Sequence, residues 1–247
     1  MAGTRIVDVT DDATFSLLPP CADPTFDHRG CDYWEDADRG SKTRRADAGG
    51  PGARPTATPA RPSLADNPFA PPARSADAFN PFLAGGDDTS DDNPFLPRRP
   101  ARPSLPADAP RKLALLIRGL AIFGSYAKVL LVDDEPCVYT QFGPLSAYPR
   151  AGRLRDLYPQ LPQAPLPAVI TCIATTGWAR GQGLAALLVE AVCDDLSGRG
   201  FSAVEAYPEI GAPPDATSAA NPPFWETAGF RQVVADERYP VFRRELV

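Results

Sequence analysis

The sequence predicts a mixed α/β (α+β) fold, and two observations carry that prediction. From residue 111 to the C-terminus, short β-branched runs alternate with segments that have helical periodicity. The longest helical segment, 181–198, follows the apolar run 168–175 through a turn that contains two glycines. A strand, a tight turn and a helix in this order are typical of a sheet with helices packed on it.

The elements expected before residue 111 are few. Residues 4–9 (TRIVDV) alternate in polarity and predict an opening edge strand. Residues 21–35 form an irregular, aromatic segment, which we expect to pack on the domain. We therefore assign residues 1–35 to an N-terminal strand and packing segment.

Residues 36–110 are expected to be a disordered insertion. Fourteen of the 30 prolines lie between Pro51 and Pro110, among many Ala, Arg, Asp and Ser residues. Such a segment cannot bury enough apolar surface to offset its ordering entropy. Asn-Pro-Phe occurs three times in it, at Asn67, Asn80 and Asn93, either as partner-docking motifs or, as we favour, in a flexible spacer.

The core is expected to span 111–247. In order, we expect a helix, a hairpin, a loop, a strand, a helix, a strand, a short helix and two closing strands. Their predicted ranges are 111–124; 128–132 with 137–142; 145–167; 168–175; 181–198; 202–207; 221–228; and 230–234 with 241–246. The acidic turn of the hairpin limits sliding of its register.

The composition argues against several classes of function. The formal net charge of −6 argues against general nucleic-acid binding, which needs clustered Lys and Arg. No apolar run is long enough to span a membrane, and the N-terminus lacks the apolar core of a signal peptide. The five cysteines are expected to be reduced thiols of a cytoplasmic protein. Abundant Ala, Pro, Gly and Arg with only three lysines indicate a G+C-rich, bacterial genome.

The turn from Arg180 to Ala185 is the strongest functional signal. A Gly-bearing turn before a helix directs backbone N–H groups and the positive end of the helix dipole at one spot, where an anion binds. A dinucleotide site would need further strands, and only about 60 residues follow the turn. A P-loop is excluded because the chain has no Gly-Lys-Ser/Thr sequence.

Arg180-x-x-Gly183-x-Ala185 resembles the R-x-x-G-x-G/A turn of the GNAT family of N-acetyltransferases, in the same strand–turn–helix context. Residues 201–208 (FSAVEAYP) look like the strand that follows the helix in that family, and 224–230 (FWETAGF) is similar to its aromatic-Tyr-Glu-x-x-Gly-Phe segment. The proline-rich insertion and the composition resemble members of actinobacterial type. This resemblance implies the GNAT fold, a central mixed, mostly antiparallel sheet, splayed between the two strands that flank the cofactor site, with helices on both faces.

The resemblance also implies acetyl-CoA as co-substrate and no metal. Backbone N–H groups of the turn would hold the pyrophosphate, and main-chain groups of the strand before it would pair with the pantetheine arm. The residues implied for these contacts are Cys172, Ile173, Ala174, Arg180, Gly181, Gln182, Gly183, Leu184, Ala185 and Trp225. Because the family polarises the thioester carbonyl with a backbone N–H, Cys172 is expected to be a core thiol and not a nucleophile.

Two residues are candidates for the catalytic chemistry. Glu205 lies near the middle of an apolar strand, and some family members place a base there; a structural ion pair with an arginine is an equal alternative. The family's usual acid is a Tyr in the position that Trp225 occupies, and an indole N–H cannot protonate a thiolate. Three alternatives follow: Tyr207 or Tyr239 acts as the acid, the thiolate leaves unprotonated with the help of water, or the protein is not an efficient enzyme.

The sequence thus predicts an acyl-CoA-dependent N-acyltransferase that transfers an acetyl group to a small-molecule or peptide amine by direct attack. The alternative is a catalytically weak or inactive acyl-CoA-binding or interaction module. A structural zinc site at Cys21, His28 and Cys31 is disfavoured, because its spacing matches no common zinc module.

Overall fold

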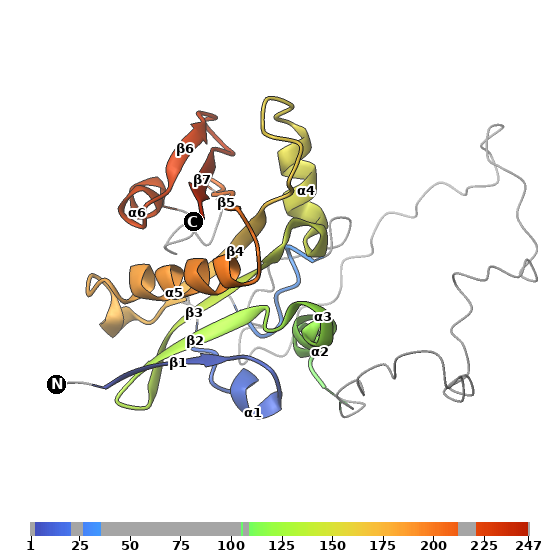
Figure 1. Ribbon diagram of the computed structural model, residues 1–247. Coiled ribbons are helices and arrows are strands. Elements are labelled where there is room, and N and C mark those ends of the chain that lie inside the picture. The colour runs from blue at the N-terminus through green and yellow to red at the C-terminus, as the bar shows by residue number, and fades with distance from the viewer. Residues whose placement is uncertain (1–2, 21–26, 36–104, 106–108, 212–220, 247) are drawn as a thin grey trace, which may run out of the picture. The chain divides into compact units, whose positions relative to one another are not determined.

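The computed structural model describes residues 3–20, 27–35, 105, 109–211 and 221–246 (Figure 1). The described strands form one seven-stranded sheet in the order β1-β2-β3-β4-β5-β7-β6. The strands are β1 (Thr4–Asp8), β2 (Ala127–Val132), β3 (Glu135–Pro144), β4 (Ala168–Thr175), β5 (Ala203–Ala206), β6 (Arg231–Val234) and β7 (Val241–Glu245). Every neighbouring pair is antiparallel except β4 and β5, which are parallel.

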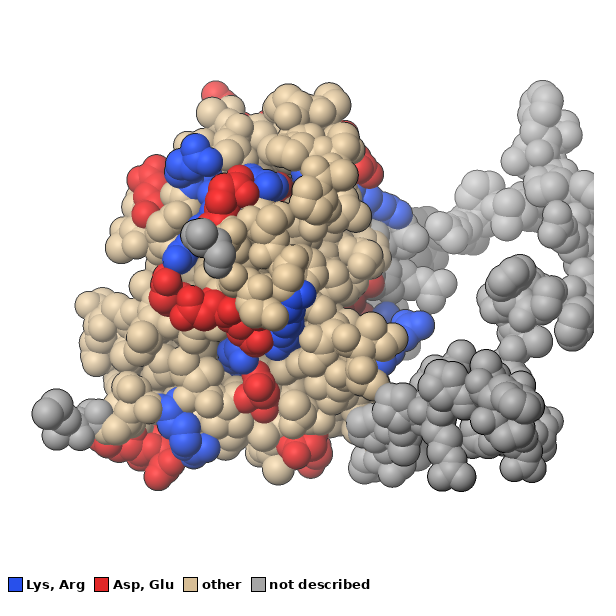
Figure 2. Space-filling model, viewed as in Figure 1, with Lys and Arg blue, Asp and Glu red and all other residues tan. Residues whose placement is uncertain are grey.

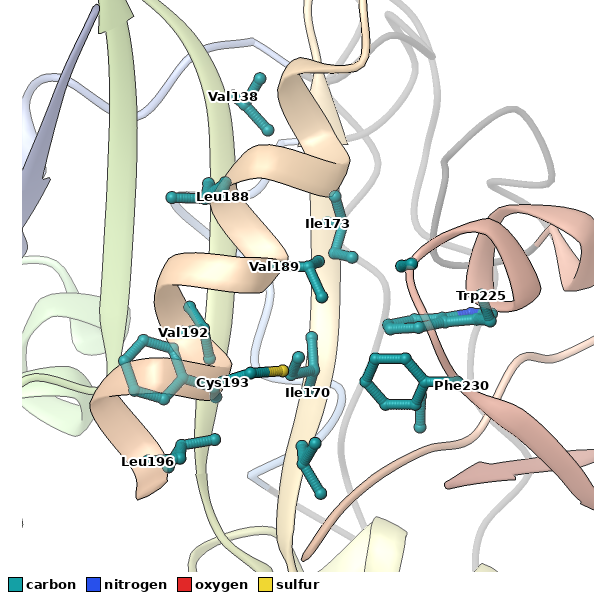
Figure 3. Close-up of a cluster of buried hydrophobic side chains, with 14 of the residues drawn as sticks. Val138, Ile170, Ile173, Leu188, Val189, Val192, Cys193, Leu196, Trp225 and Phe230 are labelled. Atoms are coloured by element: carbon teal, nitrogen blue, oxygen red, sulfur yellow. The ribbon is translucent and has the colours of Figure 1, made fainter. Parts of the chain in front are cut away.

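Helices cover both faces of this sheet. The α-helices are α1 (Asp12–Phe15), α2 (Arg111–Ile117), α3 (Leu120–Phe123), α4 (Pro149–Asp156), α5 (Leu184–Gly198) and α6 (Pro222–Thr227). Helices α5 and α6 share one buried cluster with β3, β4 and β7, in which Ile170 and Ile173 of β4 face α5 and the Trp225 ring (Figure 3). Helices α1 and α2 pack on the opposite face of β2 and β3, and α4 on that of β4 and β7. The predicted mixed α/β fold is confirmed.

The sheet opens between β4 and β5. The two strands pair only at Ala168–Val204, Val169–Glu205 and Ile170–Ala206, although β4 continues to Thr175. Just past the last pair, the register between β3 and β4 shifts, so that Thr171 is an extra residue on β4. A bulge of this kind bends a strand and increases its local twist. The described chain therefore contains the predicted splay, with its apex near Ile170 and its mouth near Thr175.

Three predicted elements differ from the structure. The single helix expected over 111–124 is two short helices, separated at Gly119, where a Cβ would collide with the hydroxyl oxygen of Tyr126. Part of the loop expected over 145–167 is helical, as η3 (Leu145–Ala147) and α4, which has a proline in its first turn. The helix expected from residue 181 begins at Leu184 instead, because Gly181 and Gly183 both adopt positive φ.

Some predictions fall outside the described residues. These are most of the insertion over 36–110 with its three Asn-Pro-Phe sequences, and Cys21 of the disfavoured zinc site. Leu105, near the end of the predicted insertion, packs against the α1–α2 cluster. This cluster is the set of buried apolar side chains between helices α1 and α2 and the sheet, among them Phe15, Leu113 and Val129. Within the described ranges, no helix is both long and apolar enough to cross a membrane.

Candidate functional site

A groove of about 350 Å³ lies where the end of β4, the turn before α5 and helix α6 meet. The turn side contributes Thr175, Ala179, Arg180, Gly181, Gly183, Leu184, Ala185 and Ala186. The α6 side contributes Asn221, Pro223, Phe224 and Thr227. The groove therefore lies at the mouth of the splay between β4 and β5.

The turn exposes backbone donors because of its two glycines. Gly181 has φ +73° and Gly183 φ +76°, values that residues with a Cβ rarely adopt. A Cβ at either position would meet no atom within 4 Å beyond its chain neighbours, so the space before the backbone is open. Gly183 is also the N-cap of α5 and supplies no side-chain cap, and the first turn of α5 carries no acidic residue. The arrangement suits an anion, because unsatisfied N–H groups and the helix dipole act at the same place.

The structure brings together part of the predicted cofactor set. Arg180, Gly181, Gly183, Leu184 and Ala185 line the groove. The side chain of Gln182 instead donates to the backbone oxygen of Trp178, at 2.8 Å. Ile173 and Ala174 are fully buried, and they lie on the part of β4 that continues beyond its last pair with β5.

Trp225 is not on the groove wall. Its side chain is 1% exposed and lies in the core, with its ring 4.9 Å from that of Phe230 (Figure 3). Phe224 and Thr227, which lie on a different side of α6 from Trp225, line the groove instead. Sequence reasoning missed both, and the helical period of 222–227 was the signal that could have found them, since residues one or two apart on a helix face different ways.

Glu205 lies at the centre of a fully buried ionic cluster. One carboxylate oxygen accepts from Arg155 of α4 at 3.0 Å and from the Tyr207 hydroxyl at 2.5 Å. The other accepts from Arg243 of β7 at 2.7 Å. Glu205 is 0% exposed, and both arginine side chains are less than 10% exposed. These contacts make the structural ion pair the better supported of the two interpretations of Glu205, because both carboxylate oxygens already accept hydrogen bonds from buried partners.

Tyr207 is buried and bound to the same carboxylate. Burial raises the pKa of its phenol well above the usual range, and the charge of Glu205 and the hydrogen bond to it act in the same direction. Tyr207 is the first residue of its chain segment beyond the β4–β5 pairing, so it lies near the apex of the splay. Tyr239, the second candidate acid, is half-buried, and its backbone oxygen accepts from Tyr158 at 2.9 Å.

The described part of the N-terminal irregular segment, 27–35, lies against the sheet. Glu35 accepts from Lys112 at 2.5 Å and from Gln141 at 2.6 Å, in a buried cluster under β3. The Nδ1 atom of His28 lies 3.6 Å from Sγ of Cys172. Cys21 lies outside the described residues, and the described ranges contain no group of three His, Cys, Asp or Glu side chains that could hold a metal.

In Figure 2, a short row of acidic side chains crosses the middle of the face, with Lys and Arg side chains next to it. In the last turn of α5, Asp195 accepts from Arg199 at 2.5 Å and lies 2.7 Å from the Lys128 ammonium. Asp195 is therefore part of a local ion cluster with both cations.

No family model matches the chain, and no curated protein is significantly similar to it. Solved structures that resemble it in fold include an acetyltransferase from Thermus thermophilus, 18% identical, with a TM-score of 0.36, covering 58% of this chain and 77% of its own. A Desulfovibrio desulfuricans protein assigned to the GNAT family of acetyltransferases is 20% identical, with a TM-score of 0.38 and coverages of 58% and 84%. The ribosomal-protein-S18-alanine N-acetyltransferase of Escherichia coli is 14% identical, with a TM-score of 0.31 and coverages of 49% and 68%. At these levels of similarity, functional inference depends on the residues of the chain itself.

Proposed function

We propose that this chain is an acyl-CoA-dependent N-acyltransferase of the GNAT family, which transfers the acetyl group of acetyl-CoA to an amine by direct attack. One observation carries the proposal: the open, glycine-lined anion groove lies at the mouth of a splayed parallel strand pair. The groove fits a pyrophosphate, and the unpaired edge of β4 fits a ligand that carries amides. Coenzyme A has both parts in one molecule.

In this proposal the chain positions the thioester more than it reacts with it. Backbone N–H groups between Gly181 and Ala185 hold the pyrophosphate, and Arg180 on the groove wall adds positive charge. The pantetheine arm runs along β4 from Thr175 toward Cys172, about 10 Å at the rise of a strand. The thioester then reaches the apex of the splay, where a main-chain N–H of β4 polarises its carbonyl. Fixing the thioester beside the amine supplies much of the rate by proximity.

Proton transfer in this proposal involves the candidates that the sequence singles out: Glu205 as base and Tyr207 as acid, with Tyr239 as the second candidate acid. Glu205 and Tyr207 lie close to the apex, but each is bound to the other and Glu205 to two arginines. Their catalytic roles therefore stay predictions, which a substitution of Glu205 tests.

A binding module without turnover is the second candidate function. It is favoured by Trp225, which stands in the position of the usual acid and is buried in the core. The two functions differ in one observable. Transfer to any member of a panel of amines supports the enzyme, whereas tight binding of acetyl-CoA without transfer or hydrolysis supports the module.

Calorimetric titration of acetyl-CoA and of desulfo-CoA into the wild type and Gly183→Glu tests the groove. The added carboxylate would repel the pyrophosphate and fill its space, so we expect affinity to fall by tenfold or more, which corresponds to about 1.4 kcal/mol or more. Gly200→Glu is the matched control, because Gly200 also has positive φ, a Cβ there also meets open space, and it follows the opposite end of α5. Absence of binding to the wild type, or equal binding to Gly183→Glu, would overturn the proposal.

The proposal also includes what the sequence predicts about the acceptor, the cellular compartment and the source of the protein. The acceptor is a small-molecule or peptide amine, the compartment is the cytoplasm, and the source is a bacterium of actinobacterial type. Neither nucleic acid nor membrane is an expected partner. Docking of a partner through the Asn-Pro-Phe sequences is a separate proposal, which deletion of 36–104 would test without touching the groove.

A further inference from the structure

Cys172 occupies a special position on β4. It is the first residue after the bulge at Thr171 and the second after the last β4–β5 pair, so it lies beside the apex of the splay. Its side chain packs with the α1–α2 cluster, on the face of the sheet opposite α5. Glu205 and Tyr207 point to that same face, through their contacts with α4 and β7. Within the proposed function, the thioester would therefore arrive next to the thiol of Cys172.

His28 is the partner of this thiol. Its Nδ1 atom lies 3.6 Å from Sγ of Cys172, and its ring centroid is 5.9 Å from that of Tyr139. The side chain is 7% exposed, and its Nε2 atom has no hydrogen-bond partner among the described residues. A buried polar atom without a partner costs free energy, so an imidazole in this state calls for an explanation beyond packing.

The imidazole is neutral, so one of its ring nitrogens has a lone pair that can accept a hydrogen bond. Burial lowers the pKa of His28 to about 4, and the nearby charge of Lys112 lowers it further, while Asp27 acts in the opposite direction. In the tautomer that accepts from the thiol, the proton is on Nε2 and the Nδ1 lone pair faces Sγ. Nucleophilic cysteines are activated by an adjacent base in this way.

The other described cysteines lack this setting. Cys137 and Cys193 are buried, and burial raises the pKa of each thiol, to about 11 for Cys193. Cys137 donates to the backbone oxygen of Leu130 at 3.4 Å. Cys172 and Cys31 are only partly buried, and of these two it is Cys172 that faces the imidazole.

We propose, contrary to the expectation that Cys172 is an inert core thiol, that Cys172 is a second acyl acceptor, which takes the acetyl group from bound acetyl-CoA with His28 as its proton acceptor. The Cys172 thiol gives its proton to Nδ1 of His28 while Sγ attacks the thioester carbonyl carbon. An Sγ–carbon bond forms, the bond between that carbon and the coenzyme A sulfur breaks, and the leaving thiolate takes the proton back from His28. The products are S-acetyl-Cys172 and coenzyme A thiol, with no oxidant or reductant consumed.

This exchange competes with transfer to the amine and does not replace it. One thioester is exchanged for another of similar stability, so the exchange needs no energy source and is reversible. S-Acetylation would occur when acetyl-CoA is bound and the amine is absent, and the added group would occupy the apex until the thiol of coenzyme A returns. The inference rests on the proposed function, because it needs acetyl-CoA in the splay.

The test uses the full chain, incubated with acetyl-CoA in the absence of an amine and followed by intact-protein and peptide mass spectrometry. We expect one added acetyl group, on the peptide that contains Cys172, that is released by hydroxylamine, as a thioester is. Cys172→Ala should abolish the adduct, and Cys31→Ala, the matched cysteine control, should leave it unchanged. His28→Gln should slow labelling by about a hundredfold, the size of a lost general base.

Acetyl-CoA binding is measured by calorimetry on the same samples, with desulfo-CoA as the unreactive competitor. Binding without labelling of Cys172, or labelling that is as fast in His28→Gln as in the wild type, would overturn this inference and leave the proposed function standing. Absence of binding would overturn the proposed function as well. Thermal melting of both variants shows whether they fold, and Cys172→Ser, which keeps the size of the side chain, replaces Cys172→Ala if that variant does not.

Discussion

Two buried polar groups on the same face of the sheet differ in how completely they are paired. Glu205 is 0% exposed, and hydrogen bonds from Arg155, Arg243 and Tyr207 take up both of its oxygens. His28 is 7% exposed and has one neighbour for Nδ1, Sγ of Cys172, while Nε2 has none among the described residues. A carboxylate whose two oxygens both accept hydrogen bonds from cations contributes to the structure. An imidazole that is only partly hydrogen-bonded and lies next to a thiol can still take part in a reaction.

The pairing of Glu205 also connects the elements around the apex. Arg155 comes from α4 and Arg243 from β7, so the carboxylate joins a helix and a neighbouring strand to β5 beside the point where β4 departs. We interpret this cluster as the support of the splay. Its charges stabilise the fold only as a complete set, because removal of one partner leaves an uncompensated charge in a low dielectric.

The largest expected effect is therefore on stability, from Arg243→Met. It leaves Glu205 without one of its two cations, and we expect the free energy of unfolding to fall by about 3 kcal/mol. Arg244→Met is the matched control on the same strand, because its partner Glu190 is about half exposed and we expect a loss below about 1 kcal/mol. Urea unfolding of both variants measures the difference. Similar losses in the two would show that the buried Glu205 cluster contributes no more to stability than the exposed ion pair does.

The second effect is a pH dependence of stability that comes from His28. Its pKa is about 4 in the folded protein and about 6.5 when unfolded, so the unfolded chain binds more protons between these values. Stability is thus fully present above about pH 6.5 and is lost as the pH falls toward 4, by about 2 kcal/mol between pH 7 and pH 5. The groups that face His28 are Lys112, Asp27, Cys172 and the Tyr139 ring.

Urea unfolding at both pH values measures this effect in the wild type and in His28→Gln. The carboxylates change the free energy of unfolding with pH equally in the wild type and in His28→Gln. The difference between the pH dependences of the two proteins is therefore the contribution of His28. Parallel slopes would show that His28 titrates as it would in water and that its burial is not maintained in solution.

The smallest expected effect is on the rate of transfer in Glu205→Gln. If the ion cluster is structural, kcat per folded molecule changes far less than the roughly hundredfold loss of a missing general base, while thermal stability falls. Steady-state assays below the melting temperature, with the folded fraction determined in parallel, separate the two roles. A loss of a hundredfold or more in fully folded protein would assign the base to Glu205 after all.

Local patterns in the sequence are sufficient to predict most of the fold. The strand over 168–175 is predicted with its observed bounds, because β-branched and apolar residues end abruptly at a glycine-bearing turn. The glycine-bearing turn is predicted at its observed place, but the positive φ of Gly181 and Gly183, which delays the start of α5 to Leu184, is not. The hairpin and the two closing strands are also predicted close to their observed positions, because apolar runs with clear turn residues between them mark their ends.

Contacts between distant segments are what the sequence could not supply. That Glu205 meets two arginines from other elements, that Trp225 turns inward while Phe224 faces the groove, and that His28 reaches Cys172 across 144 positions all depend on how the elements pack. The positions of the strands, the turns and the glycine-bearing turn before α5 can be derived from the amino-acid sequence, because they depend on neighbouring residues. The tertiary structure alone decides which polar side chains have hydrogen-bond partners and which do not. The reason is that such pairing depends on distance in space and on burial, which arise only when the elements pack together.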